Sequence, residues 1–290
     1  MNGILLIDKP AGWTSSDVVA KLRGVLHEKR IGHSGTLDPM ATGLLVIFVG
    51  RATRAVEFAE SDDKRYLARL RLGLVTDTQD ITGTVLRESG ADISGEELEK
   101  ALCAFRGRIS QIPPMYSAIK VKGQKLYEIA RRGGEVERSP REISISDLRL
   151  TGRDGEDWLL DVSCSKGTYI RTLCNDIGEK LGCGGCMSGL QRVRCGGFGL
   201  ENAHTIEQVR QAMDRGEAES LLLPIDSLFD YAPAYTAGAR EERQVRCGNA
   251  PKADLPDGEY RVYSRSGEFL ALCRCEAGAL KTVKSFFEVA

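Results

Sequence analysis

The chain has 290 residues, of which 42% are hydrophobic and 28% charged, and its formal net charge is −1. This length can bury a sizeable core in one large domain, or in a large and a small one. The balanced charge excludes a uniformly basic nucleic-acid binder, so a nucleic-acid site must gather its positive charge locally. No segment approaches the roughly 18 apolar residues of a membrane span, and the N-terminus lacks a signal-peptide pattern. We therefore expect a cytoplasmic protein that does not associate with a membrane.

The chain contains nine cysteines, an odd number in a sequence without a secretion signal. This favours reduced thiols over a disulfide framework. Cys183 and Cys186 have the spacing of metal ligands, but the sequence offers no second pair at the regular spacing of a zinc site. We expect free thiols that pack as small apolar groups, and no bound metal.

The first two expected elements are an apolar strand at residues 4–7 and an amphipathic helix that begins near Thr14. A proline and a glycine between them end the strand. Thr14 and the serines after it can cap the helix. Apolar residues recur at helical spacing from Val18 to Leu26 and predict one buried face.

Residues 32–43 surround one carboxylate, Asp38, with glycines, hydroxyl side chains and a proline. Such a run disfavours a core helix or a central strand. The apolar residues 44–49 that follow predict a buried strand, so Asp38 lies on a tight loop anchored in the core. The residue types permit an ordinary turn, in which Asp and Ser bond their own backbone, or a loop that carries chemistry. A phosphate loop is excluded, because no lysine lies within the run.

Residues 66–72 alternate between apolar and polar side chains and predict a half-buried strand with Tyr66 on its buried face. A polar turn is expected at residues 76–83. Ser94 and Glu97 then form the capping box of a helix that carries Leu98 and Leu102. From the residue types alone, Tyr66 is a core aromatic of an ordinary strand.

Residues 120–142 form a basic segment, with seven Lys or Arg against four Glu and hence a local charge of +3. A segment of this kind is either a solvated amphipathic turn or a mobile insertion that contacts phosphates.

A strand is expected at residues 159–164, followed by a helix that Thr168 could cap. Tyr169 and Arg171 lie off the apolar stripe of that helix, near its N-terminus, and are free to face a cleft. From about residue 231, short strands alternate with glycine-containing turns, which is typical of a small β-rich domain.

Residues 32–43 resemble the signature loop of the TruB family, the bacterial tRNA pseudouridine-55 synthases, with Ser34 at a position where threonine is usual. Residues 8–15, 113–118 and 164–171 resemble further motifs of that family, so the similarity covers about residues 3–230. It implies an α+β fold: a catalytic domain at 1–230, with a mixed, largely antiparallel sheet flanked by helices and an RNA-clamping insertion at about 120–142. A small β-rich, PUA-like RNA-binding domain is implied at residues 231–290.

The resemblance also implies residue roles. Asp38 becomes the catalytic aspartate and Arg171 its charged partner, and the ring of Tyr66 stacks on the target base. The implied substrate-binding residues are His33, Tyr66, Tyr169, Leu190 and Lys9.

The implied reaction isomerises uridine to pseudouridine at position 55, in the T-loop of tRNA, after the base is flipped out of the RNA. The bond from C1′ to N1 breaks, the base turns, and C1′ bonds to C5. No atoms are gained or lost, so the reaction needs no cofactor. The expected partner is the T-arm of tRNA, bound by a monomer without an obligatory protein partner.

Two other functions stay open on the sequence. One is a tRNA chaperone built on a synthase scaffold, with dispensable chemistry. The other is an aspartate-dependent glycosidase, which usually needs a second carboxylate as its acid.

Overall fold

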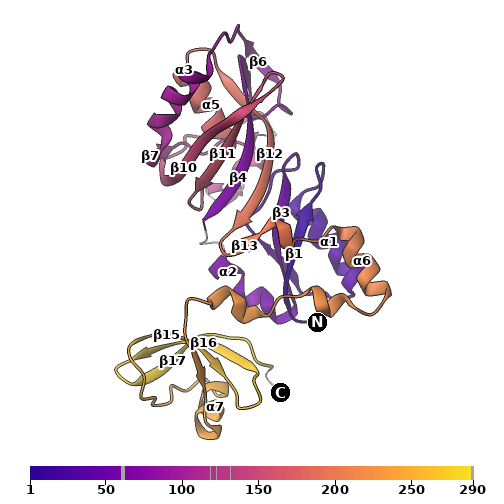
Figure 1. Ribbon diagram of the computed structural model, residues 1–290, viewed down its shortest axis with the longest axis vertical. Coiled ribbons are helices and arrows are strands. Elements are labelled where there is room, and N and C mark those ends of the chain that lie inside the picture. Colours follow the sequence, from indigo (N-terminus) through magenta and orange to yellow (C-terminus); the bar gives the residue numbers. More distant parts are fainter. Residues whose placement is uncertain (60–62, 118, 122, 131, 289–290) are drawn as a thin grey trace.

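The computed structural model describes residues 1–59, 63–117, 119–121, 123–130 and 132–288. Figure 1 shows an elongated molecule, with an upper and a middle lobe that share one sheet and a small domain at the lower end. The strands of the shared sheet are β1 (Gly3–Lys9), β2 (Ile31–Ser34), β3 (Thr42–Val49), β4 (Lys64–Leu72), β7 (Gly107–Gln111), β10 (Arg141–Asp154), β11 (Asp157–Cys164), β12 (Gly185–Cys195) and β13 (Phe198–Gly199).

The shared sheet has the strand order β1-β3-β12-β4-β11-β10-β7, with β2 beside β3 and β13 beside β12. The β3–β12 pair is parallel, and the other strand pairs of this sheet are antiparallel. The helices that pack on it are α1 (Ser15–Leu26), α3 (Gly95–Leu102), α5 (Ile170–Lys180) and α6 (Ile206–Asp214). The predicted α+β class, with a mixed and largely antiparallel sheet, is confirmed.

Local sequence signals explain the start of two helices. Thr14 Oγ1 accepts from Asp17 N at 3.0 Å, and Asp17 Oδ2 accepts from Thr14 N at 2.8 Å, so α1 begins with a capping box. The same reciprocal pair, between Ser94 and Glu97, begins α3. Both N-termini lie where the sequence predicts them.

The burial of two central strands follows from their side-chain patterns. On β4, Tyr66 and Leu70 are buried, while the outward-facing Arg65 pairs with Asp161 of β11. This is the predicted alternation. Residues 44–49 of β3 are buried on both faces of the sheet, because one set packs in the cluster of Phe48 and the other in the cluster under α1. A continuous apolar run suits such a strand.

The structure corrects the limits of the Asp38 loop. Residues 32–43 were expected to be loop, but residues 31–34 pair with β3 as β2, and Thr42 begins β3. Gly43 has a φ of +95°, and a Cβ there would clash with the carbonyl oxygen of Arg192. The glycine thus serves the close approach of two strands, and the loop is confined to residues 35–41.

The structure also corrects the predicted helix cap at Thr168. Its Oγ1 donates to the Ser165 carbonyl at 2.9 Å, and the N-cap of α5 is Tyr169, whose side chain makes no capping bond. Strands β10 and β12 were not predicted at all. Figure 1 shows β12 crossing from the upper to the middle lobe, so it joins the two halves of the sheet.

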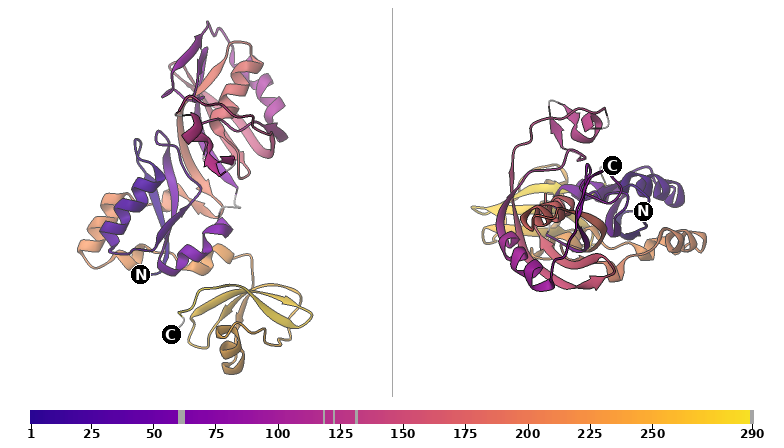
Figure 2. Two further views of the ribbon diagram at one scale, coloured as in Figure 1. Left: turned by 180° about the vertical axis from the view of Figure 1, so that it is seen from behind. Right: turned by 90° about the horizontal axis from the view of Figure 1, so that it is seen from above.

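Smaller elements complete the description. They are α2 (Val56–Ala59), β5 (Leu74–Thr76), β6 (Val85–Glu88), β8 (Lys120–Val121), β9 (Gln124–Lys125) and α4 (Leu126–Ala130). The view from above shows the segment around α4 standing away from the body of the molecule (Figure 2). This is the predicted basic insertion, of which Lys122 and Arg131 lie outside the described residues.

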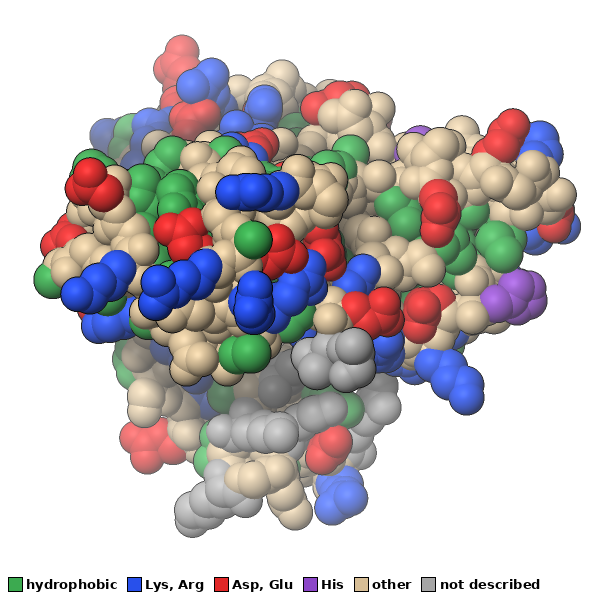
Figure 3. All heavy atoms as spheres, turned by 90° about the horizontal axis from the view of Figure 1, so that it is seen from below, with side chains coloured by type: hydrophobic (Ala, Val, Ile, Leu, Met, Phe, Trp, Pro, Cys, Tyr) green, Lys and Arg blue, Asp and Glu red, His purple; other side chains and the backbone are tan. Residues whose placement is uncertain are grey.

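The last part of the chain forms a separate four-stranded sheet with one helix. Its elements are β14 (Ala234–Thr236), α7 (Ala239–Arg246), β15 (Gly258–Tyr263), β16 (Phe269–Glu276) and β17 (Ala279–Ser285). Phe229 fixes it to the middle lobe, with its ring 5.2 Å from that of Phe58 and 5.9 Å from that of Phe286. On the face seen from below, Lys and Arg side chains are interspersed with Asp and Glu (Figure 3).

Candidate active site

Asp38 lies on a loop that is held from several sides. The Leu37 N–H donates to Ser15 Oγ at 2.9 Å, and Pro39 O accepts from the Gly12 N–H at 2.8 Å. These contacts tie the loop to the first residue of α1 and to the turn before it. The Asp38 side chain itself is 34% exposed. The carboxylate is therefore partly open to solvent, although the backbone around it is fixed.

Arg171, from the first turn of α5, forms a two-point ion pair with Asp38. Its Nε lies 2.9 Å from Asp38 Oδ2, and its Nη2 lies 3.2 Å from Oδ1. The guanidinium is 6% exposed, so the pair is screened from water on the arginine side. A fork-shaped pair of this kind fixes the orientation of the carboxylate as well as its charge.

A second carboxylate, Asp80, also contacts the Arg171 guanidinium. The distance from Nη1 to Asp80 Oδ2 is 3.4 Å, and the Asp80 side chain is 6% exposed. Thr78 Oγ1 and the Thr82 N–H donate to Asp80 at 2.9 and 3.0 Å. The remaining Arg171 donors reach the carbonyls of Thr78 and Tyr116. The sequence analysis missed Asp80, because a polar turn at residues 76–83 explains an aspartate there without further purpose.

Some surroundings of Asp38 raise the pKa of its carboxyl group and others lower it. Burial raises the pKa of its carboxyl group above the ordinary 3.8; the charge of Arg171 lowers it, Asp80 raises it, and Lys9 lowers it. Lys9 is fully buried, and its Nζ donates to the carbonyls of Pro10, Trp13 and Pro39. Burial lowers the pKa of Lys9 to about 8. Through these bonds Lys9 connects the turn after β1 with the Asp38 loop.

Tyr66 and Leu190 belong to one apolar cluster, together with Leu37 and Met40 on either side of Asp38. Tyr66 is 8% exposed, and burial raises its pKa to about 12, so the phenol stays protonated at neutral pH. The structure thus gathers these two predicted residues next to the Asp38 loop, in an apolar setting that suits the face of a base.

Tyr169 is half-buried, and the side-chain amide of Gln111 holds its backbone. Tyr169 N donates to Gln111 Oε1 at 2.8 Å, and Gln111 Nε2 donates to Tyr169 O at 3.1 Å. Gln111 is 2% exposed. These two bonds fix the N-cap of α5, two residues before Arg171. Sequence analysis missed Gln111, because a strand-end glutamine carries no signal of its partner.

His33 lies on β2, where the chain enters the Asp38 loop, and is half-buried. Burial lowers the pKa of its imidazole, and the charge of Arg192 lowers it further. The ring is therefore neutral at physiological pH. Its Nδ1 has no hydrogen-bond partner among the described residues.

The described residues contain neither a metal-binding cluster nor a membrane-spanning helix. Within residues 1–59, 63–117, 119–121, 123–130 and 132–288, no group of three or more His, Cys, Asp or Glu could hold a metal ion. No described helix is long and apolar enough to cross a membrane.

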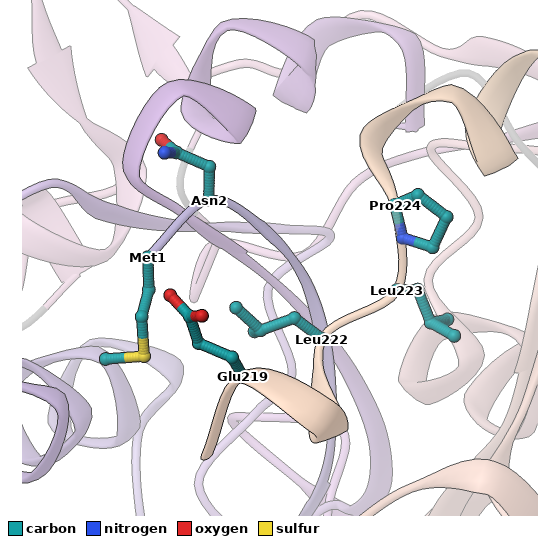
Figure 4. A pocket seen from close by; sticks show the side chains of 6 residues that line it. All are labelled: Met1, Asn2, Glu219, Leu222, Leu223 and Pro224. Atoms are coloured by element: carbon teal, nitrogen blue, oxygen red, sulfur yellow. The ribbon is translucent and has the colours of Figure 1, made fainter. Parts of the chain in front are cut away.

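A shallow pocket of about 430 Å³ is lined by Met1, Asn2, Glu219, Leu222, Leu223 and Pro224 (Figure 4). None of the predicted site residues lines it.

Comparison with known proteins matches two family models. Residues 23–170 match the TruB family pseudouridylate synthase (N terminal domain), and residues 171–230 match the tRNA pseudouridylate synthase B C-terminal domain. The junction between the models falls at the start of α5, so it separates Asp38 from Arg171 in the sequence while the fold reunites them.

Proteins named tRNA pseudouridine synthase B from several bacteria are similar to this chain. The chain is 47% identical over 249 residues to a tRNA pseudouridine synthase B of Alkaliphilus oremlandii, covering 86% of this chain and 82% of that protein. It is 39% identical over 292 residues to that of Clostridium kluyveri, covering 99% of this chain and all of that protein.

Among solved structures, a chain of a Cbf5-Nop10-Gar1 complex matches with a TM-score of 0.75 at 25% identity, over 98% of this chain and 85% of that one. A chain of an H/ACA RNP bound to a substrate RNA containing 2′-deoxyuridine matches with a TM-score of 0.74 at 23% identity, over 99% and 85%. Sequence, family models and fold agree: the chain belongs to the TruB family of pseudouridylate synthases.

Proposed function

We propose that this chain converts uridine 55 in the T-loop of tRNA to pseudouridine, with Asp38 as the catalytic carboxylate. The observation that carries the proposal is the two-point ion pair between Asp38 and the buried Arg171, beside a carboxylate that stays one-third exposed. Arg171 favours the ionised form of Asp38, which the chemistry requires, against the opposing effect of burial.

The reaction rearranges one nucleoside. The C1′–N1 bond breaks and its electron pair stays on the base; after the base turns, C5 bonds to C1′, C5 loses its proton and N1 gains one. Asp38 acts at the sugar, as the nucleophile that captures C1′ or as the base that accepts a proton. The product contains the same atoms as the substrate, so the reaction needs no cofactor.

The base must leave the RNA stack to reach Asp38. The apolar cluster of Tyr66 and Leu190 supports a role in replacing the lost stacking, and Tyr169 supports the pocket from the start of α5. We assign His33 to holding the flipped RNA, and Lys9 to shaping the loop beneath Asp38.

We further assign residues 1–230 to catalysis, the insertion at 120–142 to clamping the RNA, and residues 231–290 to a PUA-like RNA-binding domain. The insertion stands away from the body, which supports its contact with a large ligand (Figure 2). We infer that the enzyme acts on the T-arm as a cytoplasmic monomer.

Tritium release from tRNA that carries 5-tritiated uridine tests the function. We expect release by the wild type, none by Asp38→Asn, and tRNA affinity within about threefold for both, since the substitution leaves the binding surface intact. Asp214→Asn, at an exposed position of α6, is the control and should keep wild-type release. A tRNA with cytidine at position 55 should release nothing from the remaining uridines. Release by Asp38→Asn, or from that tRNA, would contradict the proposal.

The two alternatives give different outcomes in the same assay. A chaperone would bind tRNA without releasing tritium. A glycosidase would produce free uracil, but the nearby carboxylate, Asp80, is buried and ion-paired with Arg171, and thus poorly suited to donate a proton.

A further inference from the structure

Arg192 lies at the junction of the two halves of the sheet. On β12 it is directly opposite Tyr66 of β4, and on its other side it is paired with Gly43 of β3. Its side chain is fully buried, and its Nε donates to the carbonyl of Leu44 at 2.7 Å. A guanidinium is thereby fixed next to the tyrosine that we assign to the target base.

No carboxylate of the described residues forms an ion pair with this guanidinium. Nη1 and Nη2 of Arg192 are buried and make no well-aligned hydrogen bond to a described residue, but the guanidinium lies close enough to the Tyr66 phenol to lower its pKa by charge and by hydrogen bonding. Arg171 shows the usual solution, since its guanidinium contacts two carboxylates and two carbonyls. A buried charge without a partner destabilises the folded state, and such groups are rare outside functional sites.

The free end of Arg192 lies against the Asp38 loop. A Cβ added to Gly35 would lie 3.0 Å from Nη1 and 3.7 Å from Cζ of Arg192, so the guanidinium packs on the backbone of the loop. Lys64 Cε is 3.3 Å from the same point. The charge of Arg192 lowers the pKa of Lys9, in the same direction as burial, and lowers the pKa of Tyr66 against the larger effect of burial. The charge of Arg192 therefore lies under the loop.

The proposed reaction, on which this inference rests, creates an anion at this place. When the C1′–N1 bond breaks, the bonding pair leaves with the uracil, which is negatively charged until C5 bonds to C1′. We propose that Arg192 is a positioning residue whose buried positive charge has no carboxylate beside it and acts, through the Tyr66 phenol, on the departing uracil anion. Arg192 itself gives up no atom in the reaction. A fixed charge in a water-poor site stabilises an anion that forms only during the reaction.

A loss of rate without a loss of stability distinguishes this electrostatic role from a structural one. Replacing a structural arginine lowers stability and activity together. Replacing Arg192 with methionine removes a charge that burial makes unfavourable, so we expect the melting temperature to stay within about 3 °C of the wild type or to rise. The single-turnover rate at saturating enzyme should nevertheless fall by about 10- to 100-fold, with tRNA affinity within about threefold.

Two further variants accompany Arg192→Met. Arg192→Lys keeps the charge and should retain a rate within about tenfold of the wild type, and above that of Arg192→Met. Arg194→Met, at an exposed position of the same strand, should leave the rate unchanged. A wild-type rate for Arg192→Met overturns the inference. So does a loss of rate in Arg192→Met and Arg192→Lys alike that runs parallel to a fall in melting temperature.

A double-mutant cycle tests the route through Tyr66. If Arg192 acts through the phenol, adding Arg192→Met to Tyr66→Phe should cost less than about threefold in rate beyond Tyr66→Phe alone. Fully multiplicative losses contradict that route. An inactive wild type would instead refute the proposed function, so the two failures are distinguishable in one assay.

Discussion

The charge of Asp80 can be removed with little change in shape by Asp80→Asn. The asparagine keeps an oxygen that can accept from Thr78 and Thr82, as the aspartate does at 2.9 and 3.0 Å. The negative charge disappears, and an amide nitrogen, which is a donor, replaces Oδ2, the atom that lies 3.4 Å from Nη1 of Arg171. The substitution therefore measures how far the Asp38–Arg171 pair depends on a second carboxylate behind it.

The expected magnitude follows from burial. Arg171 and Asp80 are each 6% exposed, and removing one partner of a buried ion pair costs about 3–5 kcal/mol when the other charge is left alone. Arg171 is not left alone, because Asp38 stays 2.9 Å from its Nε. We therefore expect a loss of about 1–3 kcal/mol in the free energy of unfolding. The rate should fall further, by about 100-fold, because a small rotation of Arg171 misplaces Asp38.

Urea unfolding and single-turnover tritium release measure the two effects. The matched control is Asp77→Asn in the same turn; Asp77 is exposed and accepts from the Thr84 N–H at 2.7 Å. It should change the free energy of unfolding by less than about 0.5 kcal/mol and leave the rate unchanged. If Asp80→Asn behaves like this control, the second carboxylate does not hold Arg171, and the reasoning is wrong.

Three other predictions concern the same site. The rate should fall on acidification with a midpoint above pH 3.8, because burial raises the pKa of Asp38 and only its ionised form is active. A pH–rate profile with a midpoint at or below 3.8 contradicts this. Gly35→Ala should lose about 1–2 kcal/mol of stability to its φ of +67° and should also lose rate, because the new Cβ displaces Nη1 of Arg192. Gln111→Leu should lose about 1–3 kcal/mol in urea unfolding, because it leaves the Tyr169 N–H without its acceptor while the Tyr169 carbonyl keeps the Leu173 N–H, and the rate should fall with it.

The pH profile, Gly35→Ala and Gln111→Leu are each compared with a second variant. Asp80→Asn removes a charge that raises the pKa of Asp38, so it should move the acid midpoint to lower pH. Gly216→Ala has a similar φ of +72° with nothing within 4 Å, so it should lose stability without loss of rate. Gln211→Leu, at an exposed position of α6, should change stability by less than about 0.5 kcal/mol. Equal effects in target and control would remove the structural basis of the prediction.

Elements that depend on neighbouring residues were predictable from the sequence. The capping boxes at Thr14 and Ser94 need only a residue three positions away, and both are present. The alternation around Tyr66 needs only the two faces of one strand. Thr168 shows the limit of such signals, because its hydroxyl bonds to Ser165 and leaves the helix uncapped.

Elements whose role comes from distant residues were not predictable in this way. Strand β12 contains glycines, cysteines and an arginine, which match no apolar period, and its place depends on both β3 and β4. The resemblance identified Asp38 and Arg171 because each lies in a conspicuous string. Asp80 ends a string at residues 76–80 that also resembles one of the family, but its turn is locally satisfied, and its pairing with Arg171 is visible only in the fold.

Arg192 illustrates why the remaining site residues require coordinates. In the sequence it is one of many arginines, and most arginines reach solvent or a carboxylate. Its distinctive property is that its buried guanidinium lies by the Tyr66 phenol and forms no ion pair with a carboxylate of the described residues, and neither feature leaves a pattern in the chain. The missing counter-charge distinguishes Arg192 from Arg171, whose guanidinium pairs with two carboxylates in the free protein. A group kept for the reaction can stay unsatisfied until the charge that it meets is formed.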